Sequence, residues 1–525
     1  MDGHAPRRFL PGKDPMRTLG TPTLFALALT LTLVTGCKDE LVCPQGETDC
    51  GGRCVSLLSD EAHCGACGAA CGALETCSGG ACACADAVAE CGGACTDLAR
   101  DAENCGACGL ACEAAAYCTT TGGATSCTAG CEAGLVPCDR ACVDVASDRY
   151  HCGACGARCA DGEVCRDGAC RPEIYVACYA SADVRPVNAE LRDAGAPLAA
   201  NGSPTALALG DLAIYTANGG VPASVGVLPL GSQLAAATTV LTGTDVQDVT
   251  VHGGAIFAAN AFVGTIVVLD PAGDILDEVV MPGESANPHG LAAVGDRAYV
   301  PLFGKAVAPG APPSGQAIAK LDLSGLPACL AAGPGAGGCA ATDGAIDLRA
   351  IDGTATAGAY PFPASALAVG QRVFVTLSNL EYADCGGGFF EYCKPAGSGR
   401  LAVIEAASGG VSIVDLGEGC KNPGGLAVSD STLWVSCGSF GFPDLAPGGL
   451  LPVEISGAPT PRAPVATPPG FVPGNLAFCG DRGYVTDQAS GAVLPFDPAA
   501  RTVGTAVPVC PTVYFAWASD VACSE

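Results

Sequence analysis

The sequence predicts a mainly β protein, in which small disulfide-rich modules in tandem are followed by a β-propeller. Two observations lead to this fold class. Twenty-four cysteines fall between Cys43 and Cys170, in three copies of one eight-cysteine frame. After residue 172 the chain instead repeats short apolar runs divided by Gly and Pro, a pattern typical of strands and turns. Long amphipathic runs are scarce among the 73 Gly and 38 Pro of the chain.

Composition limits the compartment and the partners. A chain of 525 residues is expected to hold several domains, and its 35 cysteines are far more than a reducing cytosol leaves unpaired. Lys and Arg number 25 against 53 Asp and Glu, which gives a net charge of −28. Nucleic acids and anionic lipid head groups bind basic surfaces, so neither is an expected partner.

Residues 1–36 have the pattern of an export signal. Arg17 precedes an apolar run from Leu24 to Val34 that is too short for a membrane-spanning helix. The run ends in Val34-Thr35-Gly36-Cys37, which resembles the lipobox of bacterial lipoproteins. That resemblance implies cleavage before Cys37, lipidation of Cys37, and a short lipidated linker over residues 37–42. The alternative is an ordinary secretory cleavage site that happens to end in cysteine.

The same resemblance implies a location and a first partner. Lys38 follows the lipidated cysteine, which in bacterial lipoproteins favours sorting to the outer membrane. We therefore expect an outer-membrane lipoprotein of the cell envelope, surface-exposed or periplasmic, attached to the membrane through its lipid.

Residues 43–171 contain three modules, at 43–82, 84–127 and 131–170. Modules one and three share every cysteine spacing, and module two differs only in its last gap. Module one holds Cys43, Cys50, Cys54, Cys64, Cys67, Cys71, Cys77 and Cys82. Module two holds Cys84, Cys91, Cys95, Cys105, Cys108, Cys112, Cys118 and Cys127. Module three holds Cys131, Cys138, Cys142, Cys152, Cys155, Cys159, Cys165 and Cys170.

Each module has too few large apolar side chains for a hydrophobic core that offsets chain entropy. Four disulfides per module, each contributing roughly 2–4 kcal/mol, would stabilise it instead. Spacing leaves the connectivity open, because eight cysteines allow about 105 pairings. The Cys-Gly-x-Cys-Gly-x-x-Cys core of the modules resembles the stigma-specific cysteine-rich family over residues 43–170, and that resemblance implies an extracellular role without known chemistry.

Two other chemistries fit parts of the frame. Cys64 and Cys67 have the Cys-x-x-Cys spacing of zinc ligands, and His63 and His151 lie beside such pairs. A thiol-redox pair is the second alternative, but it normally opens a helix in a βαβ unit, which this Gly-rich region lacks. We expect disulfides, with no metal and no cofactor.

Residues 172–525 repeat one strand-turn-strand block, which predicts a propeller. Five copies are clear and one is weaker: 207–215, 291–300, 367–375, 426–435 and 476–485, with 249–257 as the weaker copy. Tyr484-Val485-Thr486-Asp487 resembles the signature of the bacterial Tyr-Val-Thr-Asn propeller repeats. The resemblance spans residues 174–525.

Seven blades are expected, with six as the alternative. The run 513–518 reads as an inner strand without later partners, and 174–178 reads as a second strand without an inner one. Joined, the two runs would close the ring. Ten cysteines remain outside the modules after Cys37, and this closure predicts their pairs: Cys178 with Cys510, Cys420 with Cys437, Cys479 with Cys523, Cys329 with Cys339, and Cys385 with Cys393.

Long loops of the third to fifth blades gather aromatic residues, although only 5% of the chain is aromatic. Exposed aromatic residues near carboxylates suit recognition of a carbohydrate or a protein. The alternative is that they pack these loops onto the ring. The candidate ligand-binding residues are Phe303, Tyr382, Phe389, Phe390, Tyr392, Phe440 and Phe442.

Catalysis finds little support in the sequence, and no catalytic residue is assigned. The propeller region contains two histidines, His252 and His289. At the place of His289 the other blades are expected to offer Thr205, Gln247, Ala364, Gly424, Gly474 and Thr512. This set forms neither a three-histidine metal site nor a histidine-assisted nucleophile. We expect a non-enzymatic lipoprotein that binds a protein, a glycan or a matrix component; the alternative is a hydrolase or lyase acting on envelope or extracellular polymers.

Overall fold

The computed structural model describes most of the chain beyond residue 47. The described residues are 48–50, 54–55, 57, 63–72, 74–78, 80–84, 89–121, 124–148, 150–159, 163–166, 168–172, 174–192, 194–210, 212–230, 234–243, 245–283, 286–304, 313–352, 359–381, 395–438, 448–511 and 518–524. The chain divides into two compact units, residues 1–98 with 107–109 and residues 99–106 with 110–525. In the described part, no helix has the length and apolar character needed to cross a bilayer.

The cysteine-rich modules consist of short antiparallel hairpins, two in each module. These are β1 (Thr48–Asp49) with β2 (Cys54–Val55), β3 (Glu75–Ser78) with β4 (Ala81–Cys84), β5 (Ala89–Cys91) with β6 (Ala94–Thr96), β7 (Tyr117–Thr121) with β8 (Ala124–Thr128), β9 (Val136–Cys138) with β10 (Ala141–Val143), and β11 (Glu163–Arg166) with β12 (Ala169–Pro172). Module two joins module three through a parallel pairing of β7 with β10.

One disulfide connectivity recurs in the modules: first cysteine to third, second to fifth, fourth to seventh, and sixth to eighth. Module two has Cys84–Cys95, Cys91–Cys108, Cys105–Cys118 and Cys112–Cys127. Module three has Cys131–Cys142, Cys138–Cys155, Cys152–Cys165 and Cys159–Cys170. Module one has Cys50–Cys67, Cys64–Cys77 and Cys71–Cys82, and Cys43 lies outside the described residues. The two cysteines of each Cys-x-x-Cys pair thus belong to different bridges.

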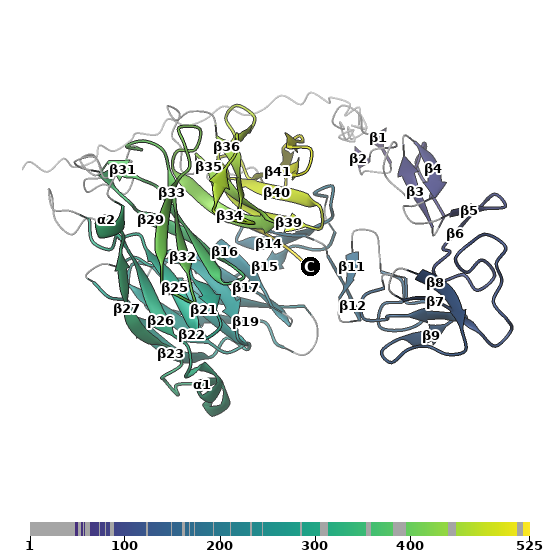
Figure 1. The fold of residues 1–525 in the computed structure, drawn as a ribbon, viewed down its shortest axis with the longest axis horizontal. Helices are drawn as coiled ribbons and strands as arrows, with labels where there is room; N and C mark the ends of the chain where they lie inside the picture. The colour runs from purple at the N-terminus through teal and green to yellow at the C-terminus, as the bar shows by residue number, and fades with distance from the viewer. Residues whose placement is uncertain are drawn as a thin grey trace, which may run out of the picture. The chain divides into compact units, whose positions relative to one another are not determined.

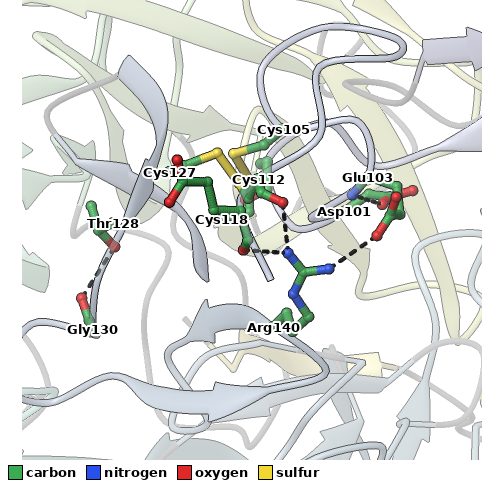
Figure 2. Close-up of a disulfide and its surroundings, with 11 residues drawn as sticks. Asp101, Glu103, Cys105, Cys112, Cys118, Cys127, Thr128, Gly130 and Arg140 are labelled. Carbon is green, nitrogen blue, oxygen red and sulfur yellow. Dashed lines mark hydrogen bonds and ion pairs between the residues drawn. A yellow bond between two sulfur atoms is a disulfide. The ribbon is translucent and has the colours of Figure 1, made fainter. Parts of the chain in front are cut away.

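Arg140 fastens module three to module two (Figure 2). Its guanidinium donates to the carbonyl oxygens of Cys112 at 2.9 Å and Glu113 at 2.8 Å, and to Glu103 Oε1 at 3.0 Å. The backbone of Arg140 has a φ of 65°, a left-handed conformation that glycine adopts more easily. Module two has a glycine, Gly93, at this place in its own frame. The strained arginine therefore supplies contacts that a glycine would lack.

The described strands of residues 174–524 form seven sheets of four or five strands (Figure 1, teal to yellow). Six of the sheets follow one another along the chain, and the seventh combines strands from both ends of this region. The first three in chain order are β16 (Ser203–Leu209), β17 (Ala213–Gly219), β18 (Ser224–Pro229) and β19 (Ala237–Val240); β20 (Val246–His252), β21 (Ala255–Asn260), β22 (Thr265–Leu269) and β23 (Ile275–Val280); and β24 (Ala292–Val294), β25 (Arg297–Leu302), β26 (Ala317–Asp322) and β27 (Ala341–Asp347). The next three are β29 (Pro363–Val369), β30 (Arg372–Leu377), β32 (Arg400–Glu405) and β33 (Val411–Asp415); β34 (Pro423–Ser429), β35 (Thr432–Cys437), β36 (Gly449–Glu454), β37 (Thr460–Pro461) and β38 (Val465–Ala466); and β39 (Pro473–Cys479), β40 (Arg482–Asp487), β41 (Ala492–Asp497), β42 (Thr502–Val503) and β43 (Val507–Pro508).

The remaining elements are a closing sheet and short connections. The closing sheet holds β13 (Ile174–Cys178), β14 (Asp183–Val187), β15 (Leu198–Ala199) and β44 (Ala518–Cys523), and the connections are α1 (Leu326–Ala332), α2 (Leu348–Ile351), β28 (Ala359–Tyr360) and β31 (Leu380–Glu381). We number the sheets as blades one to seven, from β16–β19 as blade one to the closing sheet as blade seven.

The core lies between neighbouring blades, which explains why the middle strands are buried along almost their whole length. All six residues of β21 are buried. Successive side chains of a strand point to opposite faces of its sheet. Ile256 accordingly joins a buried cluster with Tyr215 of blade one, and Phe257 joins another with Val300 of blade three. Both faces of the blade are therefore covered.

The ring closes between the two ends of the propeller region, as the sequence predicts. Strand β44 from the C-terminal end pairs antiparallel with β13 from the N-terminal end, and it also contacts β16 of blade one. The expected position of the inner strand was wrong, because β44 covers Ala518–Cys523 and not 513–518. Residues 512–517 lie outside the described residues. The aromatic run in that segment has a stronger strand pattern than the more polar stretch that forms the strand.

Four expected disulfides are present in the propeller. They are Cys178–Cys510, Cys420–Cys437, Cys479–Cys523 and Cys329–Cys339. Cys385 and Cys393 lie outside the described residues. The bridge from Cys178 to Cys510 spans 332 residues and ties blade seven to the segment that precedes its own inner strand.

Candidate functional site

One face of the ring carries both the starts of the inner strands and the loops that join second to third strands; we call it the loop face. Pro288, which precedes β24, lies opposite Leu302 at the end of β25, and this pairing places Phe303 at the loop face. Phe303 is the only predicted ligand-binding residue within the described part of the chain. The others lie outside it: Tyr382, Phe389, Phe390, Tyr392, Phe440 and Phe442.

Phe303 belongs to a row of four rings between blades three and four, which we call the aromatic ladder: His289, Phe303, Phe362 and Tyr360. His289 stacks on Phe303 with ring centroids 4.5 Å apart and planes 11° apart. Phe303 lies 5.0 Å from Phe362, and Phe362 lies 6.4 Å from Tyr360 in an edge-on contact. Phe362 is buried, whereas the other three rings are partly exposed. The ladder thus has one buried ring, Phe362, and partly exposed rings at both of its ends.

Hydrogen bonds hold the ladder in place. Buried Gln316 donates from Nε2 to the carbonyl oxygen of Phe303 at 2.8 Å, and its Oε1 accepts from the backbone N–H of Phe362 at 2.7 Å. Asn287 Nδ2 donates to the carbonyl oxygen of Gly304 at 3.0 Å. Asn287, Gln316 and Phe362 all have positive φ, at 51°, 59° and 46°. Strained backbone of this kind is often concentrated at functional sites.

His289 contributes an aromatic surface to this site and carries no charge near neutral pH. Burial lowers the pKa of its imidazole to about 4. The other inner strands have no histidine at the matching place. Thr205, Gln247, Ala364, Gly424 and Gly474 occupy that place as expected, but in blade seven it belongs to Ser519, not to Thr512, because β44 begins later than the sequence suggested.

Two carboxylates that the sequence analysis missed lie one residue further along their inner strands. Asp520 accepts from the backbone N–H of Val521 at 2.8 Å and of Leu207 at 2.9 Å, and Leu207 belongs to the next blade. Asp248 likewise accepts backbone N–H groups of Val249 and, in the next blade, of Leu291. The pKa of both carboxyls is raised to about 7, mainly by burial, and the charge of Asp248 contributes to the rise at Asp520. Both carboxylates therefore link neighbouring blades.

A third carboxylate, Asp245, precedes β20 at the loop face. Its Oδ2 accepts a hydrogen bond from Gln247 Nε2 at 2.6 Å, and burial raises its pKa. The dipeptide Asp-Val occurs at 245–246, 248–249 and 520–521, but also at 144–145 and 183–184, so it does not single out these carboxylates in the sequence.

The histidines of the modules accept hydrogen bonds from backbone N–H groups, and the cysteines beside them form disulfides. His63 Nδ1 accepts from the backbone N–H of Gly68 at 2.9 Å, and His151 Nδ1 accepts from that of Gly156 at 3.0 Å. His63 lies close to the sulfur atoms of Cys50 and Cys67, but these two atoms form a disulfide. A zinc site would require free thiolates at these positions.

Comparison with known proteins yields a family match for the last module and distant similarity for the propeller. Residues 119–173 match the stigma-specific STIG1-like protein family. No curated protein matches the chain. Similar solved structures include an inactive variant of virginiamycin B lyase from Staphylococcus aureus with quinupristin (13% identity, 61% of this chain and 92% of that chain, TM-score 0.40).

Two further structures show similarity of the same order. They are the Cps50 (Swd1) β-propeller domain from Myceliophteria thermophila (10% identity, 58% of this chain and 86% of that chain, TM-score 0.39) and BamB from Moraxella catarrhalis (13% identity, 67% and 87%, TM-score 0.37). The chain is mainly β, with disulfide-rich modules in tandem before the propeller, and this architecture fits a binding or scaffold role.

Proposed function

We propose that the protein is a non-enzymatic lipoprotein of the bacterial cell envelope, in which a disulfide stalk presents a propeller that binds a protein, a glycan or a matrix component. The observation that carries this proposal is the aromatic ladder at the loop face. Its rings are held in place by Gln316 and Asn287, and Phe303 and His289 keep part of their surface accessible. A fixed, uncharged aromatic surface suits stacking on the apolar face of a sugar ring or on a protein side chain.

The stalk and its anchor support the same proposal. Bridges in every module make a covalently closed spacer, and such disulfides persist in oxidising compartments. Lipid chains on Cys37, which lies outside the described residues, would hold the protein at a membrane, with about 0.8 kcal/mol for each buried methylene group. Outer-membrane sorting through Lys38 and exposure at the surface or in the periplasm complete the proposed location.

A hydrolase or lyase acting on envelope or extracellular polymers is the second candidate. Asp248 and Asp520 favour it, since two carboxyls with a pKa of about 7 suit proton transfer at neutral pH. Their hydrogen bonds to the next inner strand favour a structural role instead. Turnover of an envelope polymer that is lost in Asp248→Asn and kept in Phe303→Ala would support the enzyme.

A binding assay with full-length protein tests the main proposal. Purified protein in detergent is applied to envelope polysaccharides and envelope proteins, and bound material is measured for wild type, Phe303→Ala and His289→Ala. We expect each substitution to weaken binding by about tenfold, because truncating a stacked ring removes a central contact. Ile275→Ser, at the start of β23 on the opposite face of the ring, is the matched control. Unchanged binding by both ladder variants, with thermal unfolding like that of wild type, would overturn the proposal.

A further inference from the structure

A second part of the loop face, over blades one and two, gathers exposed apolar side chains that the ring does not bury. Five of the nine large apolar residues exposed in the described part of the chain lie there: Val221, Val240, Phe262, Val263 and Val280. Val221 is 86% exposed and Val280 is 71% exposed. We call these five residues the valine patch. Scattered exposed apolar residues are ordinary, but a contiguous group at one face marks an interaction surface.

Contacts between the two blades bring the loops that carry Val221 and Val263 together. The backbone N–H of Ala223, in the loop that carries Val221, donates to the carbonyl oxygen of Gly243 at 3.2 Å. A side chain at Gly243 would meet Val263 at 2.6 Å, so the loop of blade two lies directly against this glycine. Val240 and Val280 lie opposite Ser224 and Thr265, at the loop-face ends of their outer strands.

Asp245 lies in the middle of this surface. Its carbonyl oxygen accepts from the backbone N–H of Ala261, next to Phe262, and its Oδ1 lies 3.7 Å from where a side chain at Gly219 would begin. Among the described residues, Gln247 is the side chain that donates to the carboxylate, and no Lys or Arg forms an ion pair with it. A partly buried carboxylate beside loops that carry exposed apolar side chains is the complement of a cation with apolar neighbours.

We propose that the valine patch docks a protein segment that places a Lys or Arg side chain on Asp245 and apolar side chains on Val221, Phe262 and Val263. The proposal rests on the proposed binding role of the loop face and names the class of partner for a region separate from the aromatic ladder. Charge favours a basic segment over a second copy of this chain, because a copy would bring the same excess of 53 acidic over 25 basic residues. Anionic lipid and nucleic acid are disfavoured for the same reason.

Fluorescence anisotropy with full-length protein and a defined probe tests the proposal. The probe is a short labelled peptide in which Lys alternates with Val and Phe, and its counterpart carries Glu in place of Lys. We expect the Lys peptide to bind and the Glu peptide to fail. Asp245→Asn and Val221→Ser should each weaken binding of the Lys peptide by about fivefold. Added salt should weaken wild type more than Asp245→Asn, since screening acts on the ion pair.

Matched variants separate this site from general attraction to an acidic protein. Asp274→Asn removes one exposed charge at the opposite face, and Ile275→Ser removes one exposed apolar side chain there. Both should bind the Lys peptide as wild type does. Equal binding by Asp245→Asn and Asp274→Asn, or by Val221→Ser and Ile275→Ser, would overturn the proposal. Phe303→Ala should leave the peptide bound, so failure of the ladder as a site is distinguishable from failure of the patch.

Discussion

The two halves of this chain use disulfides for opposite purposes. In the modules the buried side chains are largely the cysteines themselves: Cys105, Cys112 and Cys118 form a small cluster with Ala102. In the propeller, bridges such as Cys420–Cys437 join a core that already contains Phe374, Leu433 and Val435. Disulfides therefore replace a hydrophobic core in the modules, whereas in the propeller they reinforce a core that already exists.

Removing one bridge from each half tests whether the modules depend on their disulfides more than the propeller does. Cys105→Ala with Cys118→Ala should unfold module two, because a bridge typically contributes about 2–4 kcal/mol and the module has little else that is buried. Cys420→Ala with Cys437→Ala should lower the free energy of unfolding of the propeller by a similar amount and leave it folded. Hydrogen exchange read by mass spectrometry would follow both regions at once. Persistent amide protection in module two without its bridge would contradict the comparison.

The second prediction concerns pH, to which the propeller alone should respond through buried carboxyls. Burial raises the pKa of Asp248 and Asp520 from 3.8 to about 7 in the folded state. The folded state therefore keeps protons that the unfolded chain has lost, so their contribution to stability is full below pH 4 and is lost as pH rises through 7. Between pH 5 and pH 8 the propeller should lose about 1–3 kcal/mol, a figure reduced for the partial exposure of both groups.

Urea unfolding at both pH values measures this loss. Asp248→Asn keeps an acceptor for the backbone of Val249 and removes one of the two titrating carboxyls, so it should make the pH dependence shallower. Asp274→Asn, at an exposed turn, should leave the slope unchanged. A slope in Asp248→Asn as steep as in wild type would assign the dependence to other groups.

The sequence was sufficient to predict those features that can be recognised by comparing the copies of one repeat. Equal cysteine spacings identified the modules, and the position of Cys178 and Cys510 within their blocks identified the pair that closes the ring. The module connectivity was out of reach, because it depends on how the hairpins fold back on each other. Asp248, Asp520 and Asp245 were missed for a related reason: their partners, such as Leu207 for Asp520, come from another blade and far along the chain. The last inner strand was also predicted too early in the chain, because the aromatic run at 513–517 resembles a strand more than the polar start of β44 does.

A smaller effect is expected at Arg140, one of several contacts between modules two and three. Arg140→Ala removes three hydrogen bonds to module two and keeps the left-handed backbone, so we expect a loss of about 1–2 kcal/mol at this joint. Arg140→Gly removes the same bonds but relieves the backbone, and it should recover about 1 kcal/mol of that loss. Hydrogen exchange at Cys118, whose backbone N–H donates to the carbonyl oxygen of Arg140, is the local measurement. Equal exchange in the two variants would show that the backbone strain contributes nothing. Protection like that of wild type would show that the other contacts, the parallel pairing of β7 with β10 and the ion pair of Arg100 with Asp148, hold the modules without the arginine.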